Sequence, residues 1–481
     1  MPELILPGVF IEVRAEALIV AGSITVSNIG IVGTAKRGPV GEVTILGSYA
    51  EARETFGSYD PFENPDTANN PLTLVRALEL AYANGATTVF AVRVTGTEDT
   101  GDPENSVAAW GKFSKARKAF HNVASAGGIA TILRAKNPGV WGNEMTISVT
   151  DAAPNVTVTL KYSAIEETYT VKDGKELLEK INAPNTGSLL VSATEGNQPT
   201  QAPGVTTETA FTGGVNSNDA NDTDYGLGLD QLQNENAHII LAAGRDGAAI
   251  NSRLQSHVET ASTDKIRRDR IAVTGSALGA TVPQILANTP SSDRTIFVAP
   301  GIKTSDSANA GKEVTLSGAY AAAAVAGAIS ARDAHISLTN KTISVNALET
   351  KFTPAQLEQL VTGRILALEQ RQGFRIVKGI TTDDGAFRQI TTRRIVDFAK
   401  FGVRSASSPY IGLLNNDRVR KALKGSINGF LAGMVDDEML ISYELDVTAT
   451  REEEIRGIAK VILTLRPTFS IDFIKVTMFL G

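Results

Sequence analysis

Nearly uninterrupted apolar runs recur along this chain, separated from one another by helical patterns and loops. The runs are TTVFAVRV (87–94), HIILAAG (238–244), RIAVTG (270–275) and RTIFVAPG (294–301). A strand with one face in solvent alternates apolar and polar residues, whereas a run without alternation indicates a strand covered on both faces. Strands of this kind need helices packed against them, so the pattern predicts an α/β domain.

Helix signals accompany these strands near the start of the chain. In GSYAEARETFG (47–57), Ser48 stands three residues before Glu51, which predicts a capping box, and Gly57 predicts the end of a short helix. PLTLVRALELAYANG (71–85) places Leu74, Leu78 and Tyr82 on one helical face. SITVSNIGIVGTAKRGPV (23–40) reads as a strand that closes in the turn Arg37-Gly38-Pro39. The region is therefore predicted as strand, helix, strand.

Residues 97–212 differ in character from the segments on either side. Short Thr/Val-rich stretches (MTISVT, VTVTLKYS and EETYTV) alternate with turns and with loops such as APNTG and EGNQPTQAPG. This pattern predicts a mostly β region inserted into the α/β domain. The α/β pattern returns after Tyr225, with helices predicted at 227–235 and 248–262.

The last third of the chain predicts further mixed structure. SGAYAAAAVAGAISARD (317–333) reads as a buried packing helix of small residues. TPAQLEQLVTGRILALEQRQG (353–373) predicts one helix with Thr353 as N-cap, Pro354 at its first position, and Leu357, Val361, Ile365 and Leu368 on one face. Strands are then predicted at 374–380 and 387–392, helices at 393–403 and 416–433, and strands at 439–448 and 455–466.

Composition excludes several kinds of chemistry. The 481 residues include no cysteine, and the four histidines (His121, His238, His257 and His335) lack the i,i+3 or i,i+4 spacing of a helical metal site. In GIKTSDSANAGKE (301–313), Asp306 and Glu313 replace the glycine and the Ser/Thr of a phosphate loop. The net charge of −6 argues against nucleic-acid binding, and no apolar run approaches the length of a membrane span. We see no signal peptide and expect folding in the cytoplasm.

Charged clusters are best explained as solvated surface. Asp436, Asp437 and Glu438, like Glu452, Glu453 and Glu454, lack the alternating spacing of a calcium loop. Asp383-Asp384-Gly385 predicts a hairpin turn. The helix 416–432 has an apolar face, and around it lie the basic residues Arg418, Arg420, Lys421 and Lys424.

The C-terminal sequence RPTFSIDFIKVTMFLG (466–481) is rich in β-forming apolar residues. Apolar residues are odd-numbered from Phe469 to Phe473 and mostly even-numbered from Ile474 to Leu480, so one strand needs a bulge or cover on both faces. Burying about eight such side chains yields on the order of 12–24 kcal/mol, whereas ordering about 14 residues costs roughly 20 kcal/mol. The segment therefore orders only where a sheet edge receives it. The stretch 8–14 poses the same problem, and pairing within the chain and pairing between chains remain open.

The order of several segments resembles that of contractile tail sheath proteins of long-tailed bacteriophages. PGVFIE (7–12) and AKRGPVGEVTILGSYAEARETFG (35–57) are similar to the family's opening strand, its RGP turn and its short helix ending in Phe-Gly. Later segments are similar to its PG-WGN, GG-then-Tyr, small-residue-helix, Arg-Arg-helix and terminal-strand elements: NPGVWGNEMTISV (137–149), FTGGVN (211–216) with Tyr225, SGAYAAAAVAGAISARD, ITTRRIVDF (390–398) and RPTFSIDFI (466–474).

The resemblance implies a multidomain α/β (α+β) subunit. Its parts are an outer α/β domain (26–96 plus 213–350), a mostly β inserted domain (97–212), a C-terminal α+β core domain (351–466) near the tail tube, and strand-donating arms (1–25 and 467–481). The expected inter-subunit residues are Val9, Phe10, Ile11 and Val13 in the first arm, and Phe469, Ile471, Phe473, Ile474, Val476, Met478 and Leu480 in the second. Arg418, Arg420, Lys421 and Lys424 become candidate contacts to an acidic tube surface.

The resemblance also implies a structural role without catalytic residues, cofactor or metal. The expected partners are further copies in six-fold rings stacked helically, the tail tube protein, and the baseplate and tail terminator proteins, with no nucleic acid and no stable membrane insertion. The expected location is the virion tail sheath, after synthesis in the host bacterial cytoplasm, and contraction is expected to need no nucleotide hydrolysis. The alternatives are a sheath of a tailocin or other contractile injection system and, from another class, a soluble α/β enzyme with a convergent polar pocket.

Overall fold

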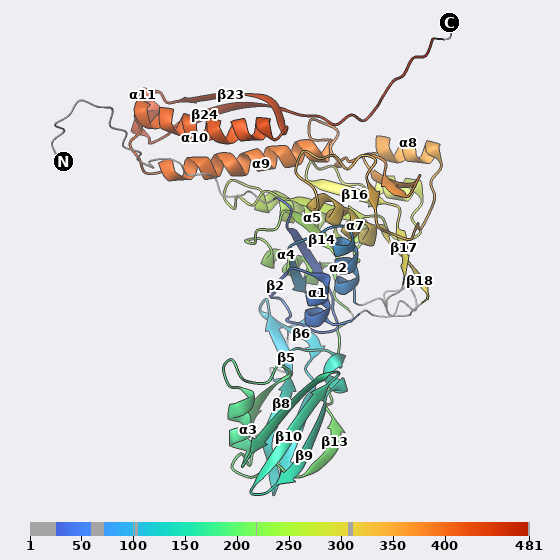
Figure 1. Cartoon of the computed structure of the whole chain (residues 1–481), viewed down its shortest axis with the longest axis vertical. Coiled ribbons are helices and arrows are strands. Elements are labelled where there is room, and N and C mark those ends of the chain that lie inside the picture. The colour runs from blue at the N-terminus through green and yellow to red at the C-terminus, as the bar shows by residue number, and fades with distance from the viewer. Residues whose placement is uncertain are drawn as a thin grey trace, which may run out of the picture. The chain divides into compact units, whose positions relative to one another are not determined.

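The computed structural model describes residues 26–58, 72–99, 101, 104–217, 219–305 and 311–479. These residues fall into two compact units (Figure 1). Unit 1 contains residues 394–470, and unit 2 contains residues 26–393 together with the C-terminal residues from Ile471. The N-terminal arm residues Val9, Phe10, Ile11 and Val13, and Leu480 of the C-terminal arm, lie outside the described residues.

A large mixed sheet forms the centre of unit 2. Six neighbouring strands are parallel, from β21 to β3, and the strands beyond them at both edges are antiparallel. Among the described residues the order is β19 (Thr342–Ile343), β22 (Phe374–Ile376), β21 (Leu366–Gln370), β16 (Thr295–Ala299), β15 (Ile271–Gly275), β14 (Ile239–Ala242), β1 (Ile29–Gly33), β3 (Val89–Arg93), β2 (Val43–Leu46). The four apolar runs thus supply β3, β14, β15 and β16, as predicted.

Helices cover both faces of this sheet. Ile31 and Val298 pack on one face with α1 (Tyr49–Phe56), α2 (Leu74–Ala83) and α7 (Gly318–Ser330). Their neighbours in sequence, such as Val32 and Phe297, point to the other face, which α4 (Asp222–Gln231), α5 (Gly247–Ala261), α6 (Val282–Ala287) and α8 (Pro354–Thr362) cover. Every residue of β1, β3, β14, β15 and β16 is buried, which explains the lack of polar alternation.

The small-residue segment forms the predicted packing helix. All 13 residues of α7 are buried, and the helix packs against α2 as well as the sheet. A Cβ atom added to Gly327 would lie 2.2 Å from the carbonyl oxygen of Ala81 in α2. The absence of a side chain at Gly327 therefore sets how closely the two helices approach.

A mostly β region lies between β3 and α4 and has its own apolar core. Its strands form three small sheets: β4 (Thr97–Glu98), β6 (Lys112–Arg117) and β5 (Ser106–Ala109); β12 (Val191–Glu195), β8 (Gly128–Ala135) and β7 (Phe120–Ser125); β11 (Ile165–Val171), β10 (Asn155–Tyr162), β9 (Thr146–Ala152) and β13 (Thr206–Ala210). The helix α3 (Gly174–Ile181) and the 3₁₀ turn η1 (Val140–Glu144) complete it. A further small sheet of unit 2 contains β18 (Glu313–Leu316), β17 (Ile302–Ser305) and β20 (Ala347–Leu348).

Unit 1 contains most of the long helix α9 (Ile390–Ser407), the turn η2 (Ser408–Tyr410), α10 (Asp417–Asp436) and α11 (Arg451–Ile455). The strands β23 (Leu440–Thr448) and β24 (Lys460–Pro467) form an antiparallel hairpin, and α10 packs against β23 through its buried residues Leu423, Ile427, Leu431 and Met434. Residues 351–393 of the range predicted as the C-terminal domain lie in unit 2. The domain limits derived from the sequence stay predictions.

Two element predictions were wrong. The helix predicted over 353–373 ends at Thr362. Leu368 lies in β21, and Ile365 is buried immediately before that strand. The i,i+4 spacing of these residues continued the helical pattern by coincidence, while Gly363 at the C-cap and Arg364 at φ 68° turn the chain into the sheet. The strand predicted at 387–392 is reduced to a single bridge between Ile380 and Gln389, because α9 already begins at Ile390.

Candidate functional site

The order of the parallel strands reverses between β1 and β14, where an α/β enzyme would have its ligand crevice. In this chain the position is filled by protein. The Tyr225 hydroxyl lies 3.0 Å from Thr73 Oγ1 and donates to the carbonyl of Ala243 at 3.2 Å, while Thr34 and Thr73 each accept a hydrogen bond from the other's backbone N–H. Tyr225 is 1% exposed, and its burial raises the pKa of the phenol. The Tyr225 hydroxyl thus lies at the position where an α/β enzyme would bind its ligand.

Further residues pack around Tyr225 and its partner Thr73. The Arg245 guanidinium lies 5.4 Å from the Tyr225 ring centroid and forms an ion pair with Asp222. A Cβ on Gly244 would lie 2.5 Å from Thr73 Cγ2, so only glycine fits there. The sequence placed Tyr225 in a family-like motif but gave no sign that its ring closes the sheet.

The histidines do not form a chemical site. Among the described residues, no group of three His, Asp or Glu side chains has the arrangement of a metal site. His257 is buried, and its Nε2 lies 3.0 Å from Nη1 of Arg270. Burial, and then the charge of Arg270, lower the pKa of His257 to about 3, so the ring is neutral. Arg270 also donates to the carbonyls of Leu232, Gln233 and Glu235 after α4, which is a structural role.

The segment that resembles a phosphate loop has the wrong surroundings. It joins β17 to β18, which pair antiparallel, whereas a phosphate loop joins a strand to a helix whose N-terminus faces the phosphate. We also find that, in the part of the chain that the structure describes, no helix is both long and apolar enough to cross a bilayer.

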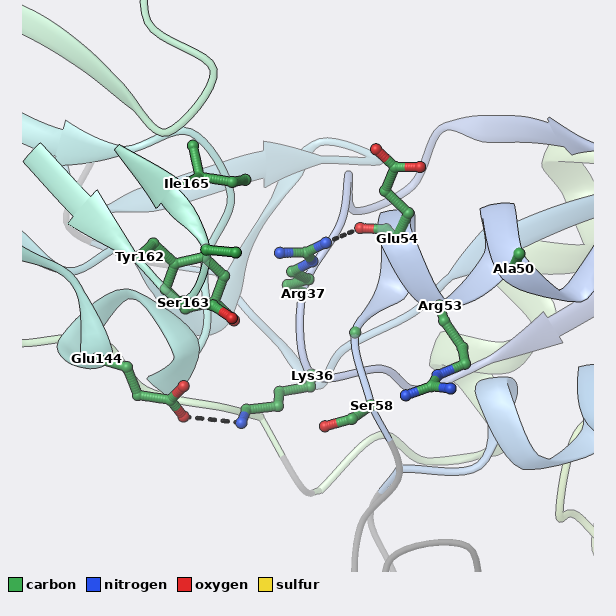
Figure 2. Close-up of a pocket in the computed structure, with 12 residues that line it drawn as sticks. Lys36, Arg37, Ala50, Arg53, Glu54, Ser58, Glu144, Tyr162, Ser163 and Ile165 are labelled. Atoms are coloured by element: carbon green, nitrogen blue, oxygen red, sulfur yellow. Dashed lines mark hydrogen bonds and ion pairs between the residues drawn. The ribbon is translucent and has the colours of Figure 1, made fainter. Parts of the chain in front are cut away.

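A polar pocket of about 560 Å³ lies between the α1 region and the turn joining β10 to β11 (Figure 2). Lys36 forms an ion pair with Glu144 at 2.8 Å, and Arg37 donates to the backbone carbonyl of Glu54. The Arg37 guanidinium also lies 5.7 Å from the ring centroid of Tyr162. Lys36 and Arg37 are therefore both paired with other groups of the protein. The contact of Arg37 with Tyr162 joins the end of β10 to the α1 region.

The hairpin β23–β24 is the one sheet among the described residues of unit 1. Among the described residues, no further strand pairs with either of its edges. Ile441 is 67% exposed and Ile462 is 49% exposed, so apolar side chains face solvent next to unpaired backbone groups. A two-stranded sheet of this kind is marginal alone and readily accepts another strand.

The described part of the C-terminal arm has the complementary properties. Residues 468–479 have no regular secondary structure. Their large apolar side chains are between 58% and 91% exposed: Phe469, Ile471, Phe473, Ile474, Val476, Met478 and Phe479. Asp472 is an exception within this segment, because its side chain contacts Lys378 and Thr339, which lie in the main part of unit 2.

The four basic residues predicted to face a tube all lie on α10. Lys421 and Lys424 form ion pairs with Asp417 and Asp446, and both pairs are solvent-exposed. Arg420 differs, since its side chain is only 13% exposed and bonds both Glu454 and Asn415. Arg418 is exposed. The structure therefore brings three of the four cations to the surface and directs Arg420 into its own subunit.

The described residues thus combine a crevice filled by Tyr225 with an open edge on the β23–β24 hairpin. Two family models match consecutive parts of the chain, the phage tail sheath protein central domain over residues 218–382 and the phage tail sheath C-terminal domain over residues 382–481. The chain belongs to the phage tail sheath family. Because this family is structural, the prediction that the chain is not an enzyme is confirmed.

Solved structures with a similar fold are also sheath proteins. The sheath tail protein of Desulfitobacterium hafniense has a TM-score of 0.65 at 15% identity, covering 96% of this chain and 100% of its own. The sheath tail protein of Listeria innocua has a TM-score of 0.64 at 14% identity, covering 92% and 96%. The helical sheath of the anti-feeding prophage in its contracted state has a TM-score of 0.57 at 15% identity, covering 99% of both chains. No curated protein sequence matches this chain.

Proposed function

We propose that this sheath subunit polymerises into six-fold rings stacked helically around a tail tube and contracts to drive the tube through a bacterial envelope for genome delivery. Subunits are joined by strands that the arms at 1–25 and 467–481 add to the hairpins of neighbours. The baseplate lies at one end of the polymer and the tail terminator at the other. The assembly is the virion tail sheath, made in the host cytoplasm.

The presence of both an open hairpin and an exposed apolar arm in the same chain is the observation on which this proposal rests. The hairpin β23–β24 leaves its edges unpaired among the described residues, and the arm leaves its apolar side chains exposed. Burying those side chains and satisfying the backbone of the arm require a sheet edge. A donor and an acceptor on different copies form a head-to-tail contact, which generates rings or helical polymers.

Contraction in this proposal needs no nucleotide hydrolysis. The extended polymer is metastable, and contacts between C-terminal domains improve when the subunits move and rotate. An interface with two packed arrangements stores free energy without a chemical fuel. Two observations support a mechanism without nucleotide binding: Tyr225 fills the crevice, and β17 is followed by its antiparallel partner β18.

The exposed cations of α10 are proposed to touch an acidic tube surface in the extended state. Exposed ion pairs are weak and screened by salt, which suits a contact that must break during contraction. Arg418, Lys421 and Lys424 contribute most, while Glu454 already neutralises much of the Arg420 charge. Reversing the charge of Arg418 and Lys421 should reduce co-assembly with the tube protein. Undiminished co-assembly of that variant would remove these residues from the interface.

The arm hypothesis is tested by expressing the chain alone and imaging it by negative-stain electron microscopy. We expect hollow tubes, and we expect deletion of 467–481 to give folded, soluble monomers. A matched pair sharpens the test: Val476→Pro removes a backbone N–H that a strand requires, whereas Val476→Thr keeps both the N–H and the β-branch. Tubes from the proline variant or from the deletion would overturn the arm hypothesis.

A sheath of a tailocin or of another contractile injection system is the second candidate. The anti-feeding prophage sheath and the sheath of an extracellular contractile injection system, with TM-scores of 0.57 and 0.56, share this fold. The β region between β3 and α4 favours a phage by analogy, because minimal sheaths do without an added domain. Finding capsid proteins in the particle that carries this sheath would decide for the phage.

A further inference from the structure

One acidic residue interrupts the apolar C-terminal arm. Asp472 lies between Ile471 and Phe473, whose side chains are 80% and 84% exposed. The Asp472 side chain has the reverse property, since it is only 11% exposed and contacts unit 2. The feature of interest is thus a partly buried carboxylate at the start of an exposed segment.

Both carboxylate oxygens of Asp472 have partners in unit 2. Lys378 Nζ lies 3.1 Å from Oδ2, and Thr339 Oγ1 donates to Oδ1 at 3.3 Å. The Thr339 hydroxyl itself accepts from the backbone N–H of Gly379 at 3.1 Å, which leaves its hydrogen for Asp472. We call Thr339, Lys378 and Gly379 the arm anchor.

The arm anchor lies at the end of a paired part of the sheet. Asn340 donates its N–H to the carbonyl of Ile376 at 2.8 Å, and Ile376 donates to Lys341 at 2.9 Å, beside the pairing of β19 with β22. A Cβ on Gly379 would lie 3.2 Å from Leu338 Cβ, so the two loops approach closely. The positions of Thr339 and Lys378 are therefore set by backbone hydrogen bonds rather than by the arm.

The next residue adds a contact in the same place. Lys378 Nζ lies 5.1 Å from the ring centroid of Phe473, within the range of a cation–π interaction. Beyond Phe473 the described residues are exposed. The contact between Lys378 and Phe473 thus lies at the point where the apolar residues of the arm change from odd to even positions.

We propose that Asp472 is a positioning residue that fixes where the C-terminal arm leaves its own subunit. The ion pair with Lys378 and the hydrogen bond from Thr339 hold the base of the arm, so that residues 473–479 project from a defined point toward the neighbour. The inference deepens the proposed function, and it depends on that function only for the purpose of the arm. Fixing one end of a binding segment lowers the entropy lost on docking.

The anchor is tested by tryptic cleavage after Lys475 in the full-length chain, followed by mass spectrometry. A protease binds several residues on each side of the bond it cuts, so cleavage there requires Asp472 to leave the arm anchor. We expect Asp472→Asn and Lys378→Gln each to speed this cleavage by about tenfold, since each removes a charge-assisted contact. Asp384→Asn, an exposed acid of the same unit, makes the same change in net charge and should leave the rate unaltered.

Coupling separates an anchor from a general loss of stability. The double variant Asp472→Asn with Lys378→Gln should be cleaved no faster than either single variant, because both remove one contact. Wild-type cleavage rates in both single variants, or rates that multiply in the double variant, would overturn the proposal. Hydrogen exchange of the peptide 468–479, with circular dichroism as a check on folding, gives a second measure of release.

Assembly distinguishes a failed anchor from a failed arm. If the anchor and the arm both act as proposed, Asp472→Asn should raise the protein concentration needed for tube formation by about tenfold, as expected for a less ordered arm. Loss of tubes on deletion of 467–481 with wild-type cleavage in Asp472→Asn would refute the anchor alone. Tubes that survive the deletion, together with faster cleavage of Asp472→Asn, would refute the arm's role and leave the anchor standing.

Discussion

Single residues in this sheath subunit act by filling positions that other α/β proteins leave open to solvent or ligand. Tyr225 closes the crevice at the sheet reversal, and Arg270 satisfies the carbonyls that follow α4. His257 belongs to the same set. Since arginine only donates, Nε2 of His257 accepts from Arg270 and the ring proton is on Nδ1. The imidazole is therefore held neutral by its surroundings.

The neutral state of His257 predicts acid sensitivity of unit 2. Its pKa is about 3 in the folded chain against about 6.5 unfolded, so between these values the unfolded state binds one more proton. Stability is then lost as the pH falls below about 6.5. We expect a loss of about 2 kcal/mol between pH 7 and pH 5 that is absent from His257→Gln, which can still accept from Arg270. Urea unfolding at the two pH values measures it.

The control for this prediction is a histidine in a different setting. His335 lies elsewhere in unit 2 and has no contact with Arg270 among the hydrogen bonds described above, so His335→Gln should keep the acid loss of the parent chain. An equal loss in the parent and in His257→Gln would show that other groups cause the acid sensitivity.

At the level of elements, the contact between α9 and α10 depends on the absence of a side chain. A Cβ on Gly402 would lie 1.9 Å from Cζ of Phe430, whose ring stacks on Phe398 at 5.8 Å. Gly425 on α10 has nothing within 4 Å of such a Cβ. The same substitution therefore has opposite consequences at two glycines of one pair of helices.

We expect Gly402→Ala to destabilise unit 1 by about 1–2 kcal/mol, because overpacking outweighs the gain in helix propensity. Gly425→Ala should instead stabilise the isolated subunit by about 0.5–1 kcal/mol. Thermal unfolding followed by circular dichroism compares the two. Adding Phe430→Leu should recover part of the Gly402→Ala loss, and equal effects of the two alanines would contradict the packing argument.

Elements were predictable where one local signal decided the outcome. The buried strands, the N-cap Ser48 and the N-cap Thr353 were correct because uninterrupted apolar runs and side-chain caps depend on neighbouring residues. The end of the helix at Gly363 was missed because Ile365 and Leu368 continue the helical spacing of apolar residues. In the structure their burial comes from the sheet instead. Partners distant in sequence were also missed, including Lys378 for Asp472 and Thr73 for Tyr225. The lone acid in FSIDFIKV was the available signal for Asp472.

The whole chain consists of two units with separate apolar cores. The core of unit 1 is built around Leu423, Ile427, Leu431 and Met434, whereas the large sheet and the β region belong to unit 2. Both tryptophans, Trp110 and Trp141, are in unit 2. Tryptophan fluorescence therefore reports unit 2 alone, while circular dichroism reports both units.

This asymmetry gives a test of independence. Below the concentration at which tubes form, Gly402→Ala should lower one transition seen by circular dichroism and leave the fluorescence transition in place. Tyr225→Ala should lower the fluorescence transition, and the two effects should add in the double variant. A fluorescence shift caused by Gly402→Ala would show that the units unfold as one.

The tyrosine that closes the sheet has a consequence for chemical control of the subunit. Truncating Tyr225 would leave a hole of the shape of phenol, lined by apolar neighbours and bounded by the Thr73 hydroxyl and the Ala243 carbonyl that its own hydroxyl now contacts. Cavities of this kind accept small ligands that match the lost group. A sheath carrying that substitution would be a structure whose stability an added phenol restores from solution.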